Sequence, residues 1–292
     1  MTRRFRTLLC IVAVVCMSLV MQKPLSAQGA APAPLIGIDH IPLAVTSLEL
    51  AAEDYSKLGF ALKPGRLHDN GIRNAHVKFP DGSGVELITA GKANDALSAH
   101  YIELLGRGEG PAYLGLHARN TDQLLSALTA GAISYSQEDG SVEPSDPRLS
   151  FIFFVRDNRS STDRPANFAH VNSAIAMSAV WIATNNSSAV AGLLTALGAV
   201  SSKETVFVPK PTTATVFTVE NGRVVVLPEA YQLIKGRPVV GASFRVTDLH
   251  AVSNTLAAAK VAPVLVSTAG RSPQLLVPPQ AAHGVWLAFS ER

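Results

Sequence analysis

The strongest constraint on the fold of this chain is a fourfold repeat in the order of its predicted elements. Strand-like segments begin near Gly37, Ala112, Ala179 and Gly241, so the repeat is roughly 65–75 residues long. Each unit has a strand, a helix and then two or three strands. One such unit cannot bury both faces of its sheet, but two units side by side can form a curved half-barrel with a concave pocket. We therefore predict an α+β fold of tandem βαβββ modules, paired into two half-barrel domains.

Turn and cap signals mark the elements inside the units. In the first unit, Thr46-Ser47 can cap a helix that Gly59 ends, and PDGS at 80–83 is a hairpin turn between two strand-like runs. In the third unit, Asn221-Gly222 lies between two β-branched runs, which is a strong hairpin signal. The glycine-rich run at 106–111 precedes a strand rather than a helix. We therefore interpret it as a joint between units and not as a phosphate loop.

The first 27 residues belong to a different class of segment. Arg3, Arg4 and Arg6 precede an uncharged, almost wholly apolar stretch at 8–21, and small residues follow up to Ala27. This pattern is typical of a secretory signal peptide cleaved after Ala27. An uncleaved membrane anchor is the alternative. We predict a secreted or periplasmic protein with a flexible leader at 28–35 and no stable membrane insertion after cleavage.

Cleavage would change the chemistry available to the chain. The net charge would move from +3 to −1, because four of the 25 basic residues and none of the 22 acidic residues precede residue 28. A near-neutral protein has no electrostatic feature that favours nucleic acid, so we predict no such partner. Cys10 and Cys16 would also be removed. Disulfides, cysteine metal sites and cysteine nucleophiles are therefore excluded from the mature protein.

Motifs in the first unit resemble the vicinal oxygen chelate superfamily, and within it the glyoxalase-like domains. They read DHIPLAV at 39–45, LGF at 58–60, HDNGIRN at 68–74 and GVEL at 84–87, and HVN at 170–172 resembles a junction in such proteins. The resemblance implies a glyoxalase/bleomycin-resistance/dioxygenase-like fold. One glyoxalase-like domain would cover 36–156 with units one and two, and a second would cover 172–292 with units three and four. The polar loop at 157–168 would connect them.

The resemblance also implies a metal site on the first and last strands of paired units. Carried over residue by residue, it implicates His40 and Glu86 as ligands of a divalent metal ion (Zn, Ni, Fe or Mn), with Glu86 also catalytic. A neutral imidazole and a carboxylate suit such an ion and leave positions open for substrate oxygens. The alternatives are a histidine hydrogen-bonded within its strand and a glutamate paired with a basic residue.

The other units depart from the ligand pattern. Their first strands carry Tyr113, a residue near Ser178, and Gly241 at the position of His40, and their last strands carry no acid. His117 lies four residues after Tyr113, on the same strand face, and is the predicted third metal ligand. His68 and His76 of the first unit are alternatives to it.

Four residues are predicted to bind substrate: His68, Arg73, Asn74 and Tyr113. The first three lie on a loop that would form the rim of the pocket if the resemblance holds, and would otherwise be solvated. His76 and Lys78 alternate with apolar residues, which favours the wet face of a strand. Trp181 and Trp286 lie on predicted strands and are interpreted as core residues.

Three functional hypotheses remain open. The first is a metal-dependent lyase, isomerase or dioxygenase that acts on a small molecule with vicinal oxygens. The second is a non-catalytic protein that sequesters a small molecule and has a degenerate metal site. The third treats units three and four as a scaffold or a dimer surface. A small-molecule ligand and a possible homodimer are the predicted partners.

Overall fold

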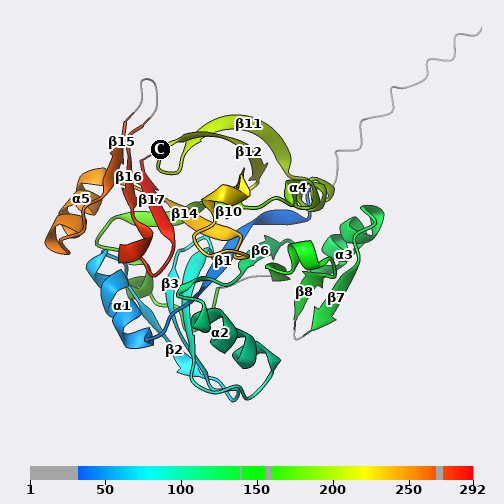
Figure 1. Cartoon of the computed structure of the whole chain (residues 1–292), viewed down its shortest axis with the longest axis horizontal. Coiled ribbons are helices and arrows are strands. Elements are labelled where there is room, and N and C mark those ends of the chain that lie inside the picture. The colour runs from blue at the N-terminus through cyan, green and yellow to red at the C-terminus, as the bar shows by residue number, and fades with distance from the viewer. Residues whose placement is uncertain (1–31, 139, 156–158, 268–271, 292) are drawn as a thin grey trace, which may run out of the picture. The chain divides into compact units, whose positions relative to one another are not determined.

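The computed structural model describes residues 32–138, 140–155, 159–267 and 272–291 (Figure 1). The predicted signal peptide and most of the predicted leader lie outside the described residues. From Ala33 onward the chain forms one compact unit. Two large sheets of about eight strands each make up most of this unit and five α-helices accompany them in its described part, which confirms the predicted α+β fold of paired βαβββ modules.

The first sheet contains the first two modules. Its strands are β1 (Leu35–Ala44), β2 (Lys63–Leu67), β3 (Ile72–Lys78), β4 (Gly84–Ala90), β5 (Gly110–Pro111), β6 (Leu114–Ala118), β7 (Tyr135–Glu138), β8 (Ser141–Pro144) and β9 (Ile152–Val155). They run in the order β2-β3-β4-β1-β6-β9-β8-β7, and β5 also pairs with β1. The first strands of the two modules, β1 and β6, form an antiparallel pair, so the modules join at the centre of the sheet.

The second sheet repeats this plan. Its strands are β10 (Ala174–Ala183), β11 (Val200–Phe207), β12 (Pro211–Val219), β13 (Gly222–Leu227), β14 (Val239–Val246), β15 (Val264–Val266), β16 (Gln274–Val277) and β17 (Trp286–Ser290). Their order is β11-β12-β13-β10-β14-β17-β16-β15, with β10 and β14 antiparallel at the centre. The same pairing in both sheets means that corresponding positions can be read from the register of the strands.

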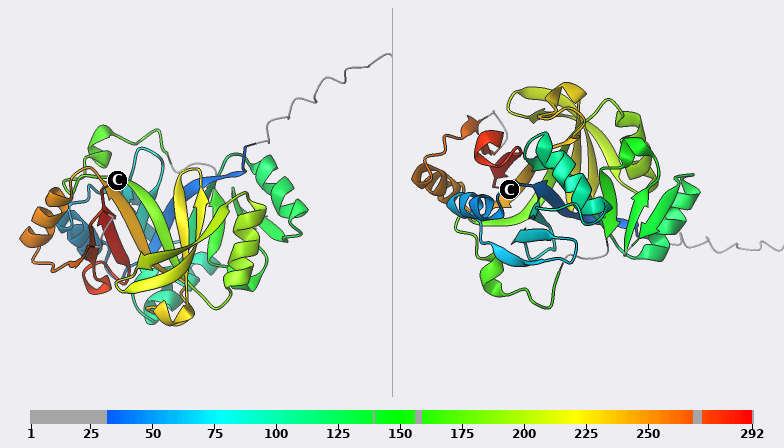
Figure 2. Two further views of the ribbon diagram at one scale, coloured as in Figure 1. Left: turned by 90° about the horizontal axis from the view of Figure 1, so that it is seen from above. Right: turned by 60° about the horizontal axis from the view of Figure 1, so that its bottom comes forward.

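The helices are α1 (Leu48–Lys57), α2 (Ala96–Gly106), α3 (Thr121–Ala130), α4 (Ser187–Ala196) and α5 (Leu249–Ala258). Ser47 caps α1 as predicted, since its Oγ accepts a hydrogen bond from the backbone N–H of Leu50 at 3.3 Å. Helices α1 and α5 lie at one end of the unit and α3 lies at the other, beside β7 and β8 (Figures 1 and 2). No helix within the described residues is long and apolar enough to cross a membrane.

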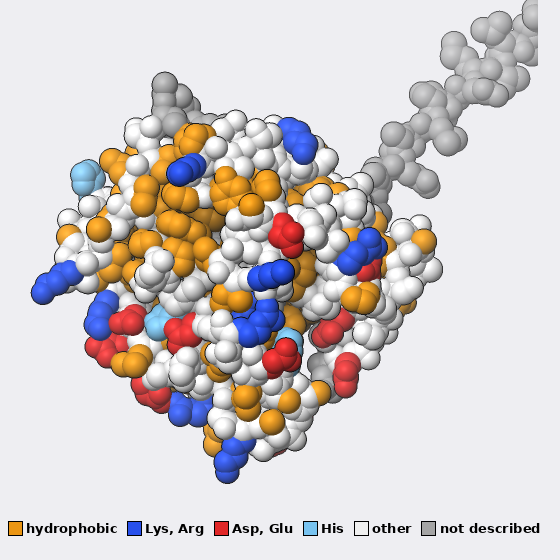
Figure 3. All heavy atoms as spheres, viewed as in Figure 1, with side chains coloured by type: hydrophobic (Ala, Val, Ile, Leu, Met, Phe, Trp, Pro, Cys, Tyr) orange, Lys and Arg blue, Asp and Glu red, His pale blue; other side chains and the backbone are white. Residues whose placement is uncertain are grey.

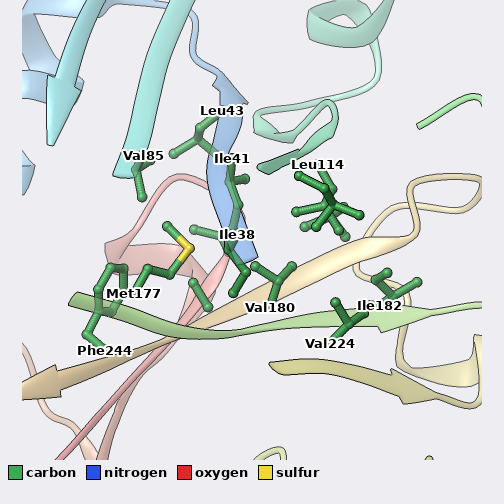
Figure 4. Close-up of a cluster of buried hydrophobic side chains, with 14 of the residues drawn as sticks. Ile38, Ile41, Leu43, Val85, Leu114, Met177, Val180, Ile182, Val224 and Phe244 are labelled. Atoms are coloured by element: carbon green, nitrogen blue, oxygen red, sulfur yellow. The ribbon is translucent and has the colours of Figure 1, made fainter. Parts of the chain in front are cut away.

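The two sheets share one hydrophobic core. Ile38 and Ile41 of β1 pack in the same cluster as Met177 and Val180 of β10 (Figure 4). A bulge lies between Ile38 and His40 on β1 and another between Met177 and Ala179 on β10, so residues three apart on each strand both reach the shared face. Four aromatic rings extend the contact between the halves, and these are Phe60 and Phe79 from the first half with Phe244 and Phe289 from the second. Both sheets therefore keep their second faces available for other roles.

The segment between the sheets is held by buried polar contacts. Asp163 accepts hydrogen bonds from Nζ of Lys78 at 2.8 and 2.9 Å and also pairs with Lys63. The side chain of Lys78 is only 3% exposed, so the prediction of a solvated strand face was wrong for this residue. Its ammonium group is instead covered by the segment that connects the two sheets. The ring of His170 bonds the backbone oxygen of Lys78 at 3.0 Å, which fixes the same strand end.

Candidate functional site

A bulge in β1 places Asp39 and His40 side by side. Against β6, Ile38 pairs with Leu116 and His40 pairs with Gly115, so Asp39 is an extra residue in the ladder. The Asp39 carboxylate forms a short hydrogen bond with Nδ1 of His40. Asp39 is 1% exposed, and its Oδ2 has no hydrogen-bond partner among the described residues. The imidazole is therefore the main group that balances this buried carboxylate.

Glu86 meets the other nitrogen of His40. Strand β4 runs parallel to β1, and its register places Glu86 on the same face as His40, away from the shared core. Oε2 of Glu86 lies 3.2 Å from Nε2 of His40, and Oε1 accepts a hydrogen bond from the amide of Asn74 at 2.6 Å. The His40 and Glu86 side chains are 13% and 17% exposed. The pair is thus largely shielded from solvent, but a small part of each side chain remains accessible.

The two carboxylates hold a proton on the histidine. Burial by itself lowers the pKa of His40, but hydrogen bonds and charge interactions with Asp39 and Glu86 outweigh it and raise the pKa from 6.5 to about 9. Burial raises the pKa of Glu86, yet its interactions with His40 lower that pKa from 4.5 to about 2. The site at neutral pH is therefore an imidazolium between two carboxylates.

This arrangement predicts a pH-dependent stability. A histidine whose pKa rises on folding stabilises the folded state below its unfolded pKa of 6.5 and loses that contribution as the pH rises through about 9. A shift of this size corresponds to about 3 kcal/mol at most. Urea denaturation of the wild type between pH 6.5 and 9.5 should show this loss, and His40→Gln should remove most of it. The exposed control His250→Gln should leave the slope unchanged, and an unchanged slope in His40→Gln would contradict the assignment.

Aromatic side chains stand beside the charged group. Phe153 of β9 meets the ring of His40 edge-on, with 5.4 Å between ring centroids, and Tyr113 lies 6.3 Å from Phe153. Tyr101 of α2 is buried and stacks edge-on against Tyr113. These rings form an aromatic wall on the side of His40 that faces the second module.

The structure brings only some of the predicted site residues together. Asn74 contacts Glu86 directly, and Tyr113 belongs to the aromatic wall. Arg73 instead pairs with Glu49 in an exposed position. His68 sits in the turn before β3, where its backbone N–H bonds Ile72. Of the remaining candidates, His76 of β3 pairs with Glu86 in the strand register, and His117 of β6 lies opposite Gly37, roughly 7 Å along the strand from the residue opposite His40.

The donor set for a metal ion is incomplete. His40 and Glu86 supply two donors, and Asp39 on Nδ1 is the kind of partner that orients a metal-binding imidazole. The described residues contain no group of three His, Cys, Asp or Glu side chains that could hold a metal ion. Phe153 fills the space beside His40 on the side of the second module. The residues present therefore do not fit the two-module metal site.

Sequence reasoning missed two residues of this site. Asp39 is part of the DHIPLAV motif, but its role depends on a bulge that periodicity does not reveal. Phe153 lies in the run FIFF at 151–154, which shows only the absence of an acid. In the second sheet, the register places Ala179 rather than Ser178 at the position of His40, because Ala179 pairs with Arg223 as His40 pairs with Gly84.

Paired βαβββ modules around a central β1–β6 junction, with His40 and Glu86 on a first and a last strand, define a protein of the vicinal oxygen chelate superfamily. The sequence profile of the glyoxalase-like domain family matches residues 38–198, and the chain belongs to that family. The predicted resemblance is thus confirmed. No curated protein sequence matches this chain significantly.

Solved structures with this fold include a synthase and two proteins named as dioxygenases. A mutant of 4-hydroxymandelate synthase from Streptomyces coelicolor shares 12% identity at a TM-score of 0.64, over 89% of this chain and 93% of that one. A catechol 2,3-dioxygenase shares 12% identity at a TM-score of 0.59, over 90% and 89%. A xylose isomerase-like TIM barrel/4-hydroxyphenylpyruvate dioxygenase fusion protein shares 11% identity at a TM-score of 0.63, over 90% of this chain and 50% of that one. At these identities the similarity shows the fold alone.

Proposed function

We propose that the first half-barrel binds a small phenolic molecule with neighbouring oxygens, and that the chain acts as a binding protein rather than as a complete metal enzyme. The observation that carries this proposal is the charged pair of His40 and Glu86 beside the aromatic wall of Tyr113 and Phe153. The names of the similar structures, among them hydroxymandelate synthase and catechol dioxygenase, support an aromatic ligand.

Glu86 is the group that would recognise the ligand. Its carboxylate has about four acceptor positions, and the structure accounts for one bond from His40 and one from Asn74. Two adjacent hydroxyls of a catechol can donate to the remaining positions while the ring packs against Phe153. The protonated His40 holds Glu86 ionised at neutral pH, so that it acts as an acceptor. In this proposal the primary role of Glu86 is to bind the ligand, and a catalytic role is secondary.

Thermal unfolding with catechol as the probe tests the proposal. We expect catechol to stabilise the wild-type protein, by about 2.7 kcal/mol at 100 times its dissociation constant, and to do so equally in the presence of EDTA. Glu86→Gln should abolish the stabilisation because it removes an ionised acceptor. His117→Ala, a control on the same sheet, should retain it. Stabilisation that survives in Glu86→Gln would overturn the proposal.

A divalent metal ion is the second candidate, and one observation favours it. His40 Nε2 and Glu86 Oε2 are close together, with Asp39 behind the imidazole as in many metal sites. Metal analysis after dialysis against Zn, Ni, Fe or Mn tests this candidate. Stoichiometric metal that is lost in His40→Ala, together with catechol stabilisation that EDTA abolishes, would replace the binding proposal with a metal-dependent one.

We further propose that the protein is exported with cleavage after Ala27. The support is the basic, apolar and small-residue pattern of the first 27 residues. The mass of the protein recovered from outside the cytoplasm tests this, and a mass that retains residues 1–27 would contradict it. The homodimer remains a prediction, which sedimentation of the mature protein can check.

A further inference from the structure

The second sheet carries its own cavity, which neither the family assignment nor the proposed function uses. The cavity measures about 280 Å³ and lies on the face of the sheet that points away from the shared core. Trp181, Val225, Arg223 and Arg245 are among its lining residues. Apolar side chains gather on this side of the molecule, over β14, β16 and β17 (Figure 3). A cavity with an aromatic floor and charged edges is a usual form for a small-molecule site.

The register of the strands explains why this cavity exists. Ala179 pairs with Arg223 as His40 pairs with Gly84, so Ala179 stands at the position of His40. Val225 likewise stands at the position of Glu86. The two polar side chains that fill the first site are thus replaced by smaller, apolar ones. The second sheet has no metal-type donors at these two positions, and the smaller side chains leave more space there.

Trp181 lines the cavity with a small part of its indole ring, and the residue as a whole is 4% exposed. Its indole N–H donates a hydrogen bond to Oγ of Ser243 at 3.0 Å, which fixes the ring. A Cβ on Gly241 would lie 2.3 Å from Cε3 of Trp181, so only glycine lets the indole lie against β14 at this point. The prediction of a core tryptophan is correct as to burial, but the ring also faces the cavity. A fixed aromatic plane is suited to stacking against another flat ring.

Among the described residues that line the cavity, one buried side-chain donor has no acceptor. Arg223 pairs with Glu204 at 2.5 Å, and Glu291 accepts a hydrogen bond from the backbone of Leu249 at the start of α5. The Nε of Arg245 is buried and has no hydrogen-bond partner among the described residues. A buried donor without an acceptor is costly, and a carboxylate can accept from Nε and a neighbouring guanidinium nitrogen together.

We propose that the second half-barrel binds an aromatic carboxylate, with its ring on Trp181 and its carboxylate on Arg245. The small volume selects a ligand of one or two rings, since typical sites for drug-sized ligands begin near 300 Å³. Binding requires no metal ion, because the positions of the metal ligands in the fold are held by Ala179 and Val225 in this sheet. The chain then has two different sites on two similar sheets.

Calorimetric titration of the mature protein with 2-naphthoate tests the proposal, with 2-naphthamide as the neutral analogue. We expect the naphthoate to bind and the amide to bind at least about 10-fold more weakly, because a charged hydrogen bond is worth more than 1.4 kcal/mol. Arg245→Gln should weaken naphthoate binding by a similar factor, and Trp181→Phe should weaken both probes. Arg148→Gln, which replaces an exposed arginine in the 3-10 turn Pro147–Leu149 of the first half, is the matched control and should bind naphthoate as the wild type does.

Three results would overturn the proposal: no binding of naphthoate to the wild type, equal affinity for acid and amide, or unchanged affinity in Arg245→Gln. The last result would also place the naphthoate elsewhere, for instance near His40. If Arg245→Gln does not fold, Arg245→Lys decides, since it keeps the charge but loses the paired donors and should still weaken binding measurably. None of these outcomes depends on whether catechol binds the first site.

Discussion

Exchange of Asp163 for asparagine is expected to lower the free energy of unfolding by about 3 kcal/mol. The carboxylate is 9% exposed and is the common partner of Lys63 and Lys78. Its exchange breaks the ion pair with the buried ammonium of Lys78, and breaking a buried ion pair from one side typically costs about 3–5 kcal/mol. Asparagine has nearly the same size, so the effect should come from charge and not from packing. Urea denaturation at pH 7 measures it.

Asp146→Asn is the matched control. Asp146 pairs with Arg148 on the surface, so its exchange should cost less than about 1 kcal/mol. The loss at Asp163 should also depend on pH. Burial raises the pKa of Asp163, but the two lysines lower it from 3.8 to about 2, so its contribution is present above pH 3.8 and disappears as the pH falls towards 2. Equal losses at the two aspartates would show that the connecting segment is not held by this contact.

Truncation of Phe244 to alanine is expected to cost about 4 kcal/mol, the middle of the range for buried aromatic residues. Its ring lies 5.2 Å from that of Phe60 and 5.7 Å from that of Phe79, measured between centroids, and 5.5 Å from that of Phe289. Since Phe60 and Phe79 belong to the first half, the cavity left by the ring would open between the two sheets. Chemical denaturation followed by fluorescence and by circular dichroism measures the loss.

Leu265→Ala is the control for this change, because that side chain is 64% exposed and should contribute less than about 0.5 kcal/mol. The two spectroscopic signals should give one common transition in Phe244→Ala if the sheets unfold together. A loss below about 1 kcal/mol, or two separate transitions, would mean that the aromatic cluster does not couple the halves.

Much of the fold could be predicted from the sequence because it depends on local signals. Caps such as Ser47, turns such as Asn221-Gly222 and the recurring strand starts each reflect nearby residues, and their repetition indicated paired modules. The site was predicted in part for the same reason, since His40 and Glu86 belong to local motifs. What failed depends on contacts between distant segments.

Lys78 shows this limit most clearly. Its alternation with apolar neighbours is typical of a solvated strand face, but the return of the chain near Asp163 covers it. Phe153 lies on β9, and β6 stands between β9 and β1. Its ring nevertheless reaches His40 on β1, a contact that the local sequence does not show. The cavity at Trp181 forms because the side chains of Ala179 and Val225 are small. Empty space of this kind has no sequence motif that would predict it. Periodicity therefore predicts the face of a sheet on which a residue lies, but not which distant segment of the chain covers that face.

The shared core has a consequence for how such a chain can be divided. Gly37 of β1 bridges to Asn221, at the turn before β13, and the backbone N–H of Asn221 bonds the oxygen of Ile36 at 2.7 Å. A fragment that ends before β10 would expose Ile38, Ile41 and their neighbours to water and would be prone to aggregate. The repeated modules are therefore not independent units of folding, and the two halves must be expressed and engineered together.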